Sequence, residues 1–148
     1  MIFARVPELT ALTLAWLVAS VLKVPIYYLI NRRWNWALIF GTGGMPSSHS
    51  ALMSSTTLAI GLFHGFDSPV FALAIAISTV VIYDAAGVRR QAGIHAERIN
   101  MIIQEFFQGR PVPQQDLKEM LGHTPIEVAG GVILGILCAL FTYLVLPK

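Results

Sequence analysis

Two histidines in this sequence stand where apolar segments begin. His49 follows a glycine-rich stretch and two serines, and His123 comes directly before a threonine and a proline. Helix N-termini carry unpaired backbone N–H groups and a partial positive charge, so both positions are suited to binding an anion. A neutral imidazole can attack phosphorus, and a protonated one can give its proton to the leaving oxygen. The pair therefore suits phosphoryl transfer, although His49 could also be only a polar residue after a helix cap at the membrane surface.

A carboxylate lies one helical turn after the second histidine. Glu127 is at the i+4 position from His123, where it could accept a hydrogen bond from Nδ1–H and hold the imidazole in one tautomer. A second interpretation is purely structural. Thr124 as N-cap, Pro125 at the first helical position and Glu127 at the third make a capping box. The sequence leaves both roles open.

Two charged residues interrupt apolar runs, which is costly in a membrane and marks functional candidates. Lys23 lies about two turns before the end of the first run, and Asp84 lies near the end of the third. Each has an ordinary alternative, since the lysine could reach the membrane surface and the aspartate could pair with Arg89 or Arg90. The other two histidines, His64 and His95, are interpreted as surface residues.

The composition is that of an integral membrane protein. Of the 148 residues, 55% are hydrophobic and 12% are charged, against about 25% charged in soluble domains, and the mean hydropathy is +0.68. A net charge of +2 does not suggest a nucleic-acid partner. Cys138 is the single cysteine, so an intramolecular disulfide is excluded. The length fits one domain over residues 1–148.

The apolar runs predict an all-α membrane bundle of about four hydrophobic helices with one amphipathic helix at the cytoplasmic interface. The amphipathic helix is expected over 94–107, after a connector at 85–93 that leaves the membrane. The second run is the shortest and is rich in Ser and Thr, so it and the third run could span the membrane or turn back within it. The four spans are expected at 9–30, 50–66, 70–86 and 125–146.

Local signals place the helix ends. Ser47 or Ser48 is expected to cap the second span, with His49 in its first turn. Pro69 at the first helical position marks the start of the third span. A short helix is expected over 116–121, stopped by Gly122.

The basic residues predict the orientation. Two fall on the side of the termini, Arg5 and Lys148, and seven fall in the connectors on the other side: Arg32, Arg33, Arg89, Arg90, Arg98, Arg110 and Lys118. The positive-inside rule then makes these connectors cytoplasmic and puts both termini outside. The same topology gathers the unusual polar residues at the cytoplasmic end, namely Lys23, His49, Asp84, His123 and Glu127. Because the sequence has no H-E-x-x-H motif and no cysteine pair, no metal and no cofactor are expected.

Three sequence blocks resemble a known family. Pro46-Ser47-Ser48-His49 is similar to the P-S-G-H motif of the type 2 phosphatidic acid phosphatase superfamily, and residues 123–131 are similar to its H-x-x-x-D-V-x-x-G block, with Glu in place of Asp. Residues 43–50, 84–93 and 121–131, taken in order, resemble the divergent branch labelled acid phosphatase/vanadium-dependent haloperoxidase-related. The resemblance covers Lys23 to about Gly135.

This resemblance implies a role for each matching residue. His123 would be the nucleophile, His49 the general acid, and Glu127 the residue that orients His123. Ser47 and the backbone of Ser48 would hold phosphate oxygens. Lys23 would stand for the lysine of the K-x6-R-P motif. The implied partner is a lipid or polyprenyl phosphate in the membrane.

Two phosphate-binding arginines of the family are missing from their expected positions. Leu29 and Ile30 stand in place of the Arg-Pro of K-x6-R-P, and Leu117 stands in place of the arginine of S-R-x5-H. We therefore expect other residues to help bind the substrate: Arg33, Asp84, Arg89 and Arg90.

These observations favour a metal-independent membrane phosphatase acting on a lipid or polyprenyl phosphate. The missing arginines leave a second function open, a non-catalytic protein that binds or transports lipid phosphates with a degenerate phosphatase site. A third interpretation is a structural membrane subunit without a site.

Overall fold

A computed structural model describes residues 6–41, 43–107 and 123–146, with the side chains of 88–90 and 104–107 left out. All regular structure in these ranges is helical, as the sequence predicts. The elements are α2 (Pro7–Asn31), the short 3-10 helix η1 (Trp36–Ile39), α3 (Ser48–His64), α4 (Pro69–Ala86), α5 (Val88–Phe107) and α6 (Pro125–Val145).

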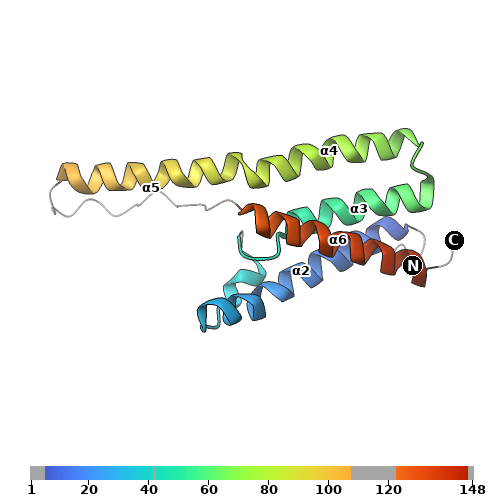
Figure 1. Ribbon diagram of the computed structural model, residues 1–148, viewed down its shortest axis with the longest axis horizontal. Helices are drawn as coiled ribbons and strands as arrows, with labels where there is room; N and C mark the ends of the chain where they lie inside the picture. The colour runs from blue at the N-terminus through green and yellow to red at the C-terminus, as the bar shows by residue number, and fades with distance from the viewer. Residues whose placement is uncertain (1–5, 42, 108–122, 147–148) are drawn as a thin grey trace.

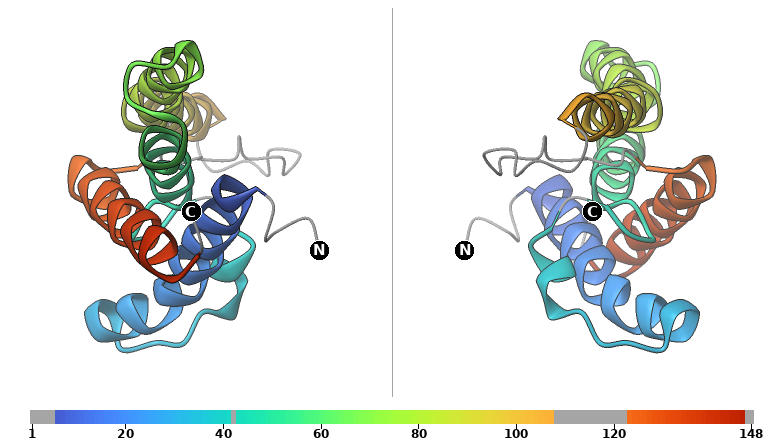
Figure 2. Two further views of the ribbon diagram at one scale, coloured as in Figure 1. Left: turned by 90° about the vertical axis from the view of Figure 1, so that its right-hand side faces the viewer. Right: turned by 90° about the vertical axis from the view of Figure 1, so that its left-hand side faces the viewer.

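The helix α3 occupies the centre of the bundle. It contacts α2, α4 and α6, and the end-on views in Figure 2 show these three helices around it. The start of α2 and the end of α6 lie at the same end of the bundle (Figure 1). The chain enters α3 and α6 at the opposite end, where α4 ends.

Small residues form the interior of this bundle. The buried apolar side chains around α3 are mostly alanines, including Ala15, Ala51 and Ala139. Glycines on α6 bring the α3 backbone still closer, because a Cβ on Gly131 would collide with the Ser47 carbonyl and one on Gly135 with that of Ala51. Small residues at helix interfaces are a common means of close helix packing in membranes.

Among the residues that the structure describes, three helical segments are long and apolar enough to cross a membrane: Pro7–Asn31, Pro69–Ile103 and Pro125–Val145. The fourth hydrophobic helix, α3, has 17 residues and a length of about 25 Å, slightly less than the ~30 Å hydrocarbon core. It is the segment with the weakest sequence signal for a span, and in the bundle its neighbours cover it.

The connector predicted at 85–93 is instead helical. The Gly87 N–H donates to the Tyr83 carbonyl at 2.8 Å, and Gly87 keeps a right-handed helical conformation (φ −108°, ψ −71°). The chain therefore passes from α4 into α5 with little change of direction, and α5 extends past the rest of the bundle (Figure 1). The amphipathic helix starts at Val88 rather than at residue 94, and it continues the line of α4. The short helix predicted over 116–121 lies outside the described residues.

The predicted helix starts are confirmed. Ser47 caps α3, Ser68 caps α4 ahead of Pro69, and Thr124 forms a capping box with Glu127 at the start of α6.

Candidate active site

The candidate site lies where α3 and α6 begin and α4 ends. Two backbone hydrogen bonds hold these ends together. The Ser47 N–H donates to the Glu127 carbonyl at 2.9 Å, and the His123 N–H donates to the Ala85 carbonyl at 3.1 Å. Segments far apart in the sequence therefore meet at one end of the bundle.

A glycine turn and a buried serine set the entry into α3. Gly43 and Gly44 have positive φ angles of 106° and 78°, which glycine adopts readily. The Ser47 hydroxyl then accepts hydrogen bonds from the Ser50 N–H at 3.3 Å and the Ser50 hydroxyl at 3.1 Å. Ser47 is completely buried. Its side chain thus caps α3 and places His49 in the first turn.

The two roles foreseen for Glu127 are both present. Its Oε2 atom lies 3.1 Å from His123 Nδ1 and accepts a hydrogen bond from the Thr124 N–H at 2.9 Å. One oxygen therefore completes the capping box and contacts the imidazole. When Nδ1 carries the proton donated to this carboxylate, the second ring nitrogen, Nε2, has the lone pair that nucleophilic attack requires.

The two imidazoles face each other across a short gap. Their ring centroids are 6.3 Å apart and the rings are tilted by 58°. His123 is buried, with 5% of its surface exposed, while His49 is partly exposed. Each ring sits at the N-terminus of a different apolar helix.

Lys23 brings a buried cation to the same place. It is 1% exposed, and its Nζ donates to the Gly41 carbonyl at 3.1 Å and to the Ser48 hydroxyl at 3.3 Å. No carboxylate among the described side chains lies within ion-pair distance of Nζ. The ammonium group therefore has neutral hydrogen-bond acceptors directly beside the serine that precedes His49.

For the remaining predicted site residues, no contact with the two histidines is described. Asp84 is partly buried in the last turn of α4, one residue before the Ala85 carbonyl that binds the His123 backbone. Arg33 is exposed in the connector after α2. Arg89 and Arg90 belong to the first turn of α5, and their side chains lie outside the described part of the molecule.

The structure adds residues that the sequence interpretation missed. Gly41 and Ala85 contribute backbone carbonyls, for which no sequence signal exists. Gly131 and Gly135 hold α6 against α3, and their spacing matches the small-xxx-small pattern of membrane helix pairs. Within the described ranges, no group of His, Cys, Asp and Glu side chains is arranged to hold a metal ion.

The profile of the Divergent PAP2 family matches residues 5–138. The uncharacterized membrane protein YuiD of Bacillus subtilis (strain 168) is 41% identical over 133 residues, covering 82% of this chain and 84% of that protein. No solved structure gives a significant match. The family match includes both histidine blocks, all of α3 and the first two thirds of α6. The chain thus belongs to the divergent PAP2 family and, with its long apolar helices, is a membrane protein.

Proposed function

We propose that this protein is a metal-independent phosphatase that hydrolyses a lipid or polyprenyl phosphate at one end of its helical bundle. The main supporting observation is the facing pair His49 and His123, 6.3 Å apart, with His123 bonded to Glu127. The two rings lie at the starts of different helices and close to each other, so a phosphate bound at these helix starts lies beside both rings. Both imidazoles can therefore contact the same phosphate group.

Helix ends and Lys23 would hold the phosphate. An ammonium group has three N–H donors, and two of those on Lys23 reach Gly41 and Ser48. The third can donate to a phosphate oxygen. The N-termini of α3 and α6 both lie at this end of the bundle, and their helix dipoles add further positive potential.

The first chemical step would transfer the phosphoryl group to the protein. The Nε2 lone pair of His123 forms a bond to phosphorus while the bond from phosphorus to the alcohol oxygen breaks. Protonated His49 gives its proton to that oxygen, so the lipid alcohol leaves neutral. Glu127 would stabilise the positive charge that develops on the His123 ring.

The second step would release phosphate. A water molecule attacks phosphorus, His49 takes a proton from that water, and the bond between His123 Nε2 and phosphorus breaks. The products are inorganic phosphate and the histidine pair in its starting protonation states. Neither step needs a metal.

A non-catalytic lipid-phosphate binder or transporter is the second candidate. The exposed position of Arg33 favours it, because this arginine was expected to replace a missing phosphate-binding arginine. With Lys23 in place but without the missing arginines, the site would still bind phosphate. It would stabilise the charge that develops during phosphoryl transfer less than a site with those arginines. The two candidate functions use the same site and differ only in whether the phosphate ester is hydrolysed there.

Measuring phosphate release separates these candidates. Purified protein should hydrolyse a lipid phosphate or an aryl phosphate without added metal, and vanadate should inhibit it. Phosphohistidine is hydrolysed in acid, so an acid quench would destroy the intermediate. It should therefore be trapped with labelled substrate under alkaline conditions. His95→Ala, at an exposed site on α5, is the matched control for His123→Ala. Phosphate binding with turnover no higher than in His123→Ala would overturn the enzyme proposal in favour of the binder.

We further place this end of the bundle on the cytoplasmic side, because the basic connectors lie there. Single cysteines at Gln91 and Asp67, introduced into a Cys138→Ala background, sit in α5 and in the connector at the other end of α4. A membrane-impermeant thiol reagent should label the cysteine at 67 in intact cells and the cysteine at 91 only after the membrane is opened. The opposite pattern would reverse the orientation.

A further inference from the structure

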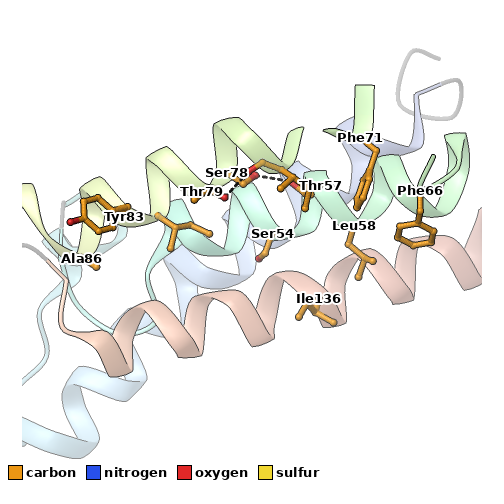
Figure 3. Close-up of a pocket in the computed structure, with 12 residues that line it drawn as sticks. Ser54, Thr57, Leu58, Phe66, Phe71, Ser78, Thr79, Tyr83, Ala86 and Ile136 are labelled. Carbon is orange, nitrogen blue, oxygen red and sulfur yellow. Dashed lines mark hydrogen bonds between the residues drawn. The ribbon is translucent and has the colours of Figure 1, made fainter. Parts of the chain in front are cut away.

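An apolar groove runs along the bundle beside the candidate site. It has a volume of about 780 Å³ and lies between α3, α4 and α6. Figure 3 shows Tyr83 and Ala86 at one end, Leu58 and Ile136 along its walls, and Phe66 and Phe71 at the other end. Its volume lies within the range of ligand sites, about 300–1,000 Å³.

The groove begins where the candidate site ends. Ala86 lines it, and the preceding residue, Ala85, accepts the backbone hydrogen bond of His123 at 3.1 Å. Ser54 lines the groove on α3, one turn after Ser50, which binds the capping Ser47. A molecule with its phosphate between the histidines could therefore extend into the groove.

The groove offers hydrocarbon surface even though hydroxyl groups line it. The Ser54 hydroxyl donates to the Ser50 carbonyl at 2.7 Å, and the Thr79 hydroxyl donates to the Ile75 carbonyl at 2.8 Å. Thr57 and Ser78 bind each other across the two helices, as the dashed line in Figure 3 shows. Because these hydroxyls are satisfied within the protein, the groove suits an apolar occupant.

The groove is open toward the membrane along α4. Ile75 is 46% exposed and Tyr83 is 74% exposed, so a chain can enter from the side. Fifteen positions of α4 separate Phe71 from Ala86, a distance of about 22 Å at the helical rise. One half of a bilayer core is about 15 Å deep. The groove is thus longer than the depth of one leaflet.

Two phenylalanines close the far end. The rings of Phe66 and Phe71 meet edge to face, with centroids 5.1 Å apart. The Phe66 ring lies directly on Gly61, where a Cβ would collide with it. This contact holds the ring pair at a fixed distance from the histidines.

We infer that the groove between α3, α4 and α6 holds the single long hydrocarbon chain of the phosphate ester, and that the Phe66–Phe71 pair sets the chain length. The inference rests on the proposed phosphate site but not on turnover, since a non-catalytic binder would use the same groove. The substrate would then be a phosphate ester with one long hydrocarbon chain, and this chain would enter the groove sideways from the membrane.

Photocrosslinking in nanodiscs of phosphatidylcholine tests this placement. The probes are octyl, dodecyl and hexadecyl phosphates with a diazirine at the end of the chain, and adducts are mapped by mass spectrometry. The adducts should move from Ile82 and Tyr83 with the short probe to Phe66 and Phe71 with the long one. The corresponding alcohols, which lack the phosphate anchor, should show no such progression.

A variant on α6 gives an independent measurement. Ile136→Trp would fill the groove and should lower the yield of hexadecyl adducts at Phe66 and Phe71 by about tenfold. Ile133→Trp, on the same helix but outside the groove and 60% exposed, is the matched control and should have no effect.

Several outcomes would overturn the inference. One is an adduct pattern independent of chain length, and another is an identical pattern with the alcohols, which would mean that ordinary bilayer lipid fills the groove. A third is an adduct yield that is lower in nanodiscs with two copies of the protein than in nanodiscs with one. That result would mean that a second copy of the protein occupies the groove. If the protein hydrolyses substrate but gives any of these results, the phosphatase proposal stands and only the groove inference is wrong. If the adducts follow chain length but there is no hydrolysis, only the phosphatase proposal is wrong.

Discussion

Both ends of the bundle carry a histidine beside a carboxylate, and the two pairs are built in opposite ways. At the site end, Glu127 lies in the first turn of α6 and His123 lies two residues before that helix begins. The histidine is the buried partner, with 6% of its side chain exposed. At the other end, His64 Nε2 lies 2.6 Å from Glu8 Oε1 and joins α3 to α2. There the histidine side chain is 57% exposed and the carboxylate is buried.

The surroundings of the two pairs differ as well. His123 faces a second imidazole and lies in a region with a buried ammonium group and two helix N-termini. His64 lies at the C-terminal end of α3, where the helix dipole favours a cation and not an anionic substrate. The first pair is suited to chemistry on phosphate, and the second fastens two helices together.

The largest expected effect comes from removing each histidine in turn. His123→Ala should lower phosphate release by at least about 1,000-fold, since it removes the nucleophile. His64→Ala should change activity by less than about threefold, but it should lower the stability by about 1–3 kcal/mol, because it leaves the buried Glu8 carboxylate without this partner. Initial rates and thermal unfolding in detergent measure both. Similar losses of activity in the two variants would contradict the distinction between the ends.

The next effect concerns the cation. Lys23→Met removes the buried ammonium group at similar length and should weaken vanadate inhibition by about 10- to 100-fold, the range for a charged hydrogen bond. Arg33→Gln changes an exposed residue in the connector and should leave the inhibition constant nearly unchanged. A large loss in Arg33→Gln would show that this arginine reaches the phosphate after all.

Glu127 gives a smaller contrast, because its two contacts can be separated chemically. Glu127→Gln keeps an oxygen for the capping box, but it loses the negative charge that stabilises a positively charged His123. Activity should fall by about 10- to 100-fold while the unfolding temperature stays close to that of the parent. Unchanged activity in this variant would reduce Glu127 to a helix cap.

The smallest effect should come from two neighbouring glycines. An alanine at Gly131 collides with the Ser47 carbonyl, whereas one at Gly130 meets only the flexible end of Met45 at 3.3 Å. Gly131→Ala should lower the stability by about 1–3 kcal/mol, and Gly130→Ala by much less. Unfolding in a denaturing detergent series provides the measurement. Equal stability would show that α3 and α6 can separate slightly without cost.

Local sequence signals predicted the helix starts, because caps depend on residues within one turn. Ser47 and Thr124 cap their helices and Pro69 is the first residue of α4, as the sequence indicates. The amphipathic helix α5 was predicted to start too late, at residue 94 and not at Val88, since Gly87 and the two arginines close after it are typical of a connector. A glycine can also keep helical angles, as Gly87 does, and neighbouring turns then carry the helix through.

Long-range placement was only partly predictable. The positive-inside pattern and the alternating direction of the helices predicted that His49 and His123 lie at the same end of the bundle. They did not predict the 6.3 Å distance between the two ring centroids. The contact between Glu8 and His64 was missed, although antiparallel neighbours α2 and α3 bring the start of one helix to the end of the other. The groove depends on the spacing of α3, α4 and α6, which no local pattern encodes.

The hydrogen bond from the Ser47 N–H to the Glu127 carbonyl ties the start of α3 directly to the first turn of α6. Gly131 and Gly135 keep the two helices in contact over the following turns. When a bilayer becomes thicker or thinner, its helices adapt by tilting. Because these contacts join α3 to α6, we expect the two helices to tilt as one unit and the gap between the two imidazoles to be the same in membranes of different thickness.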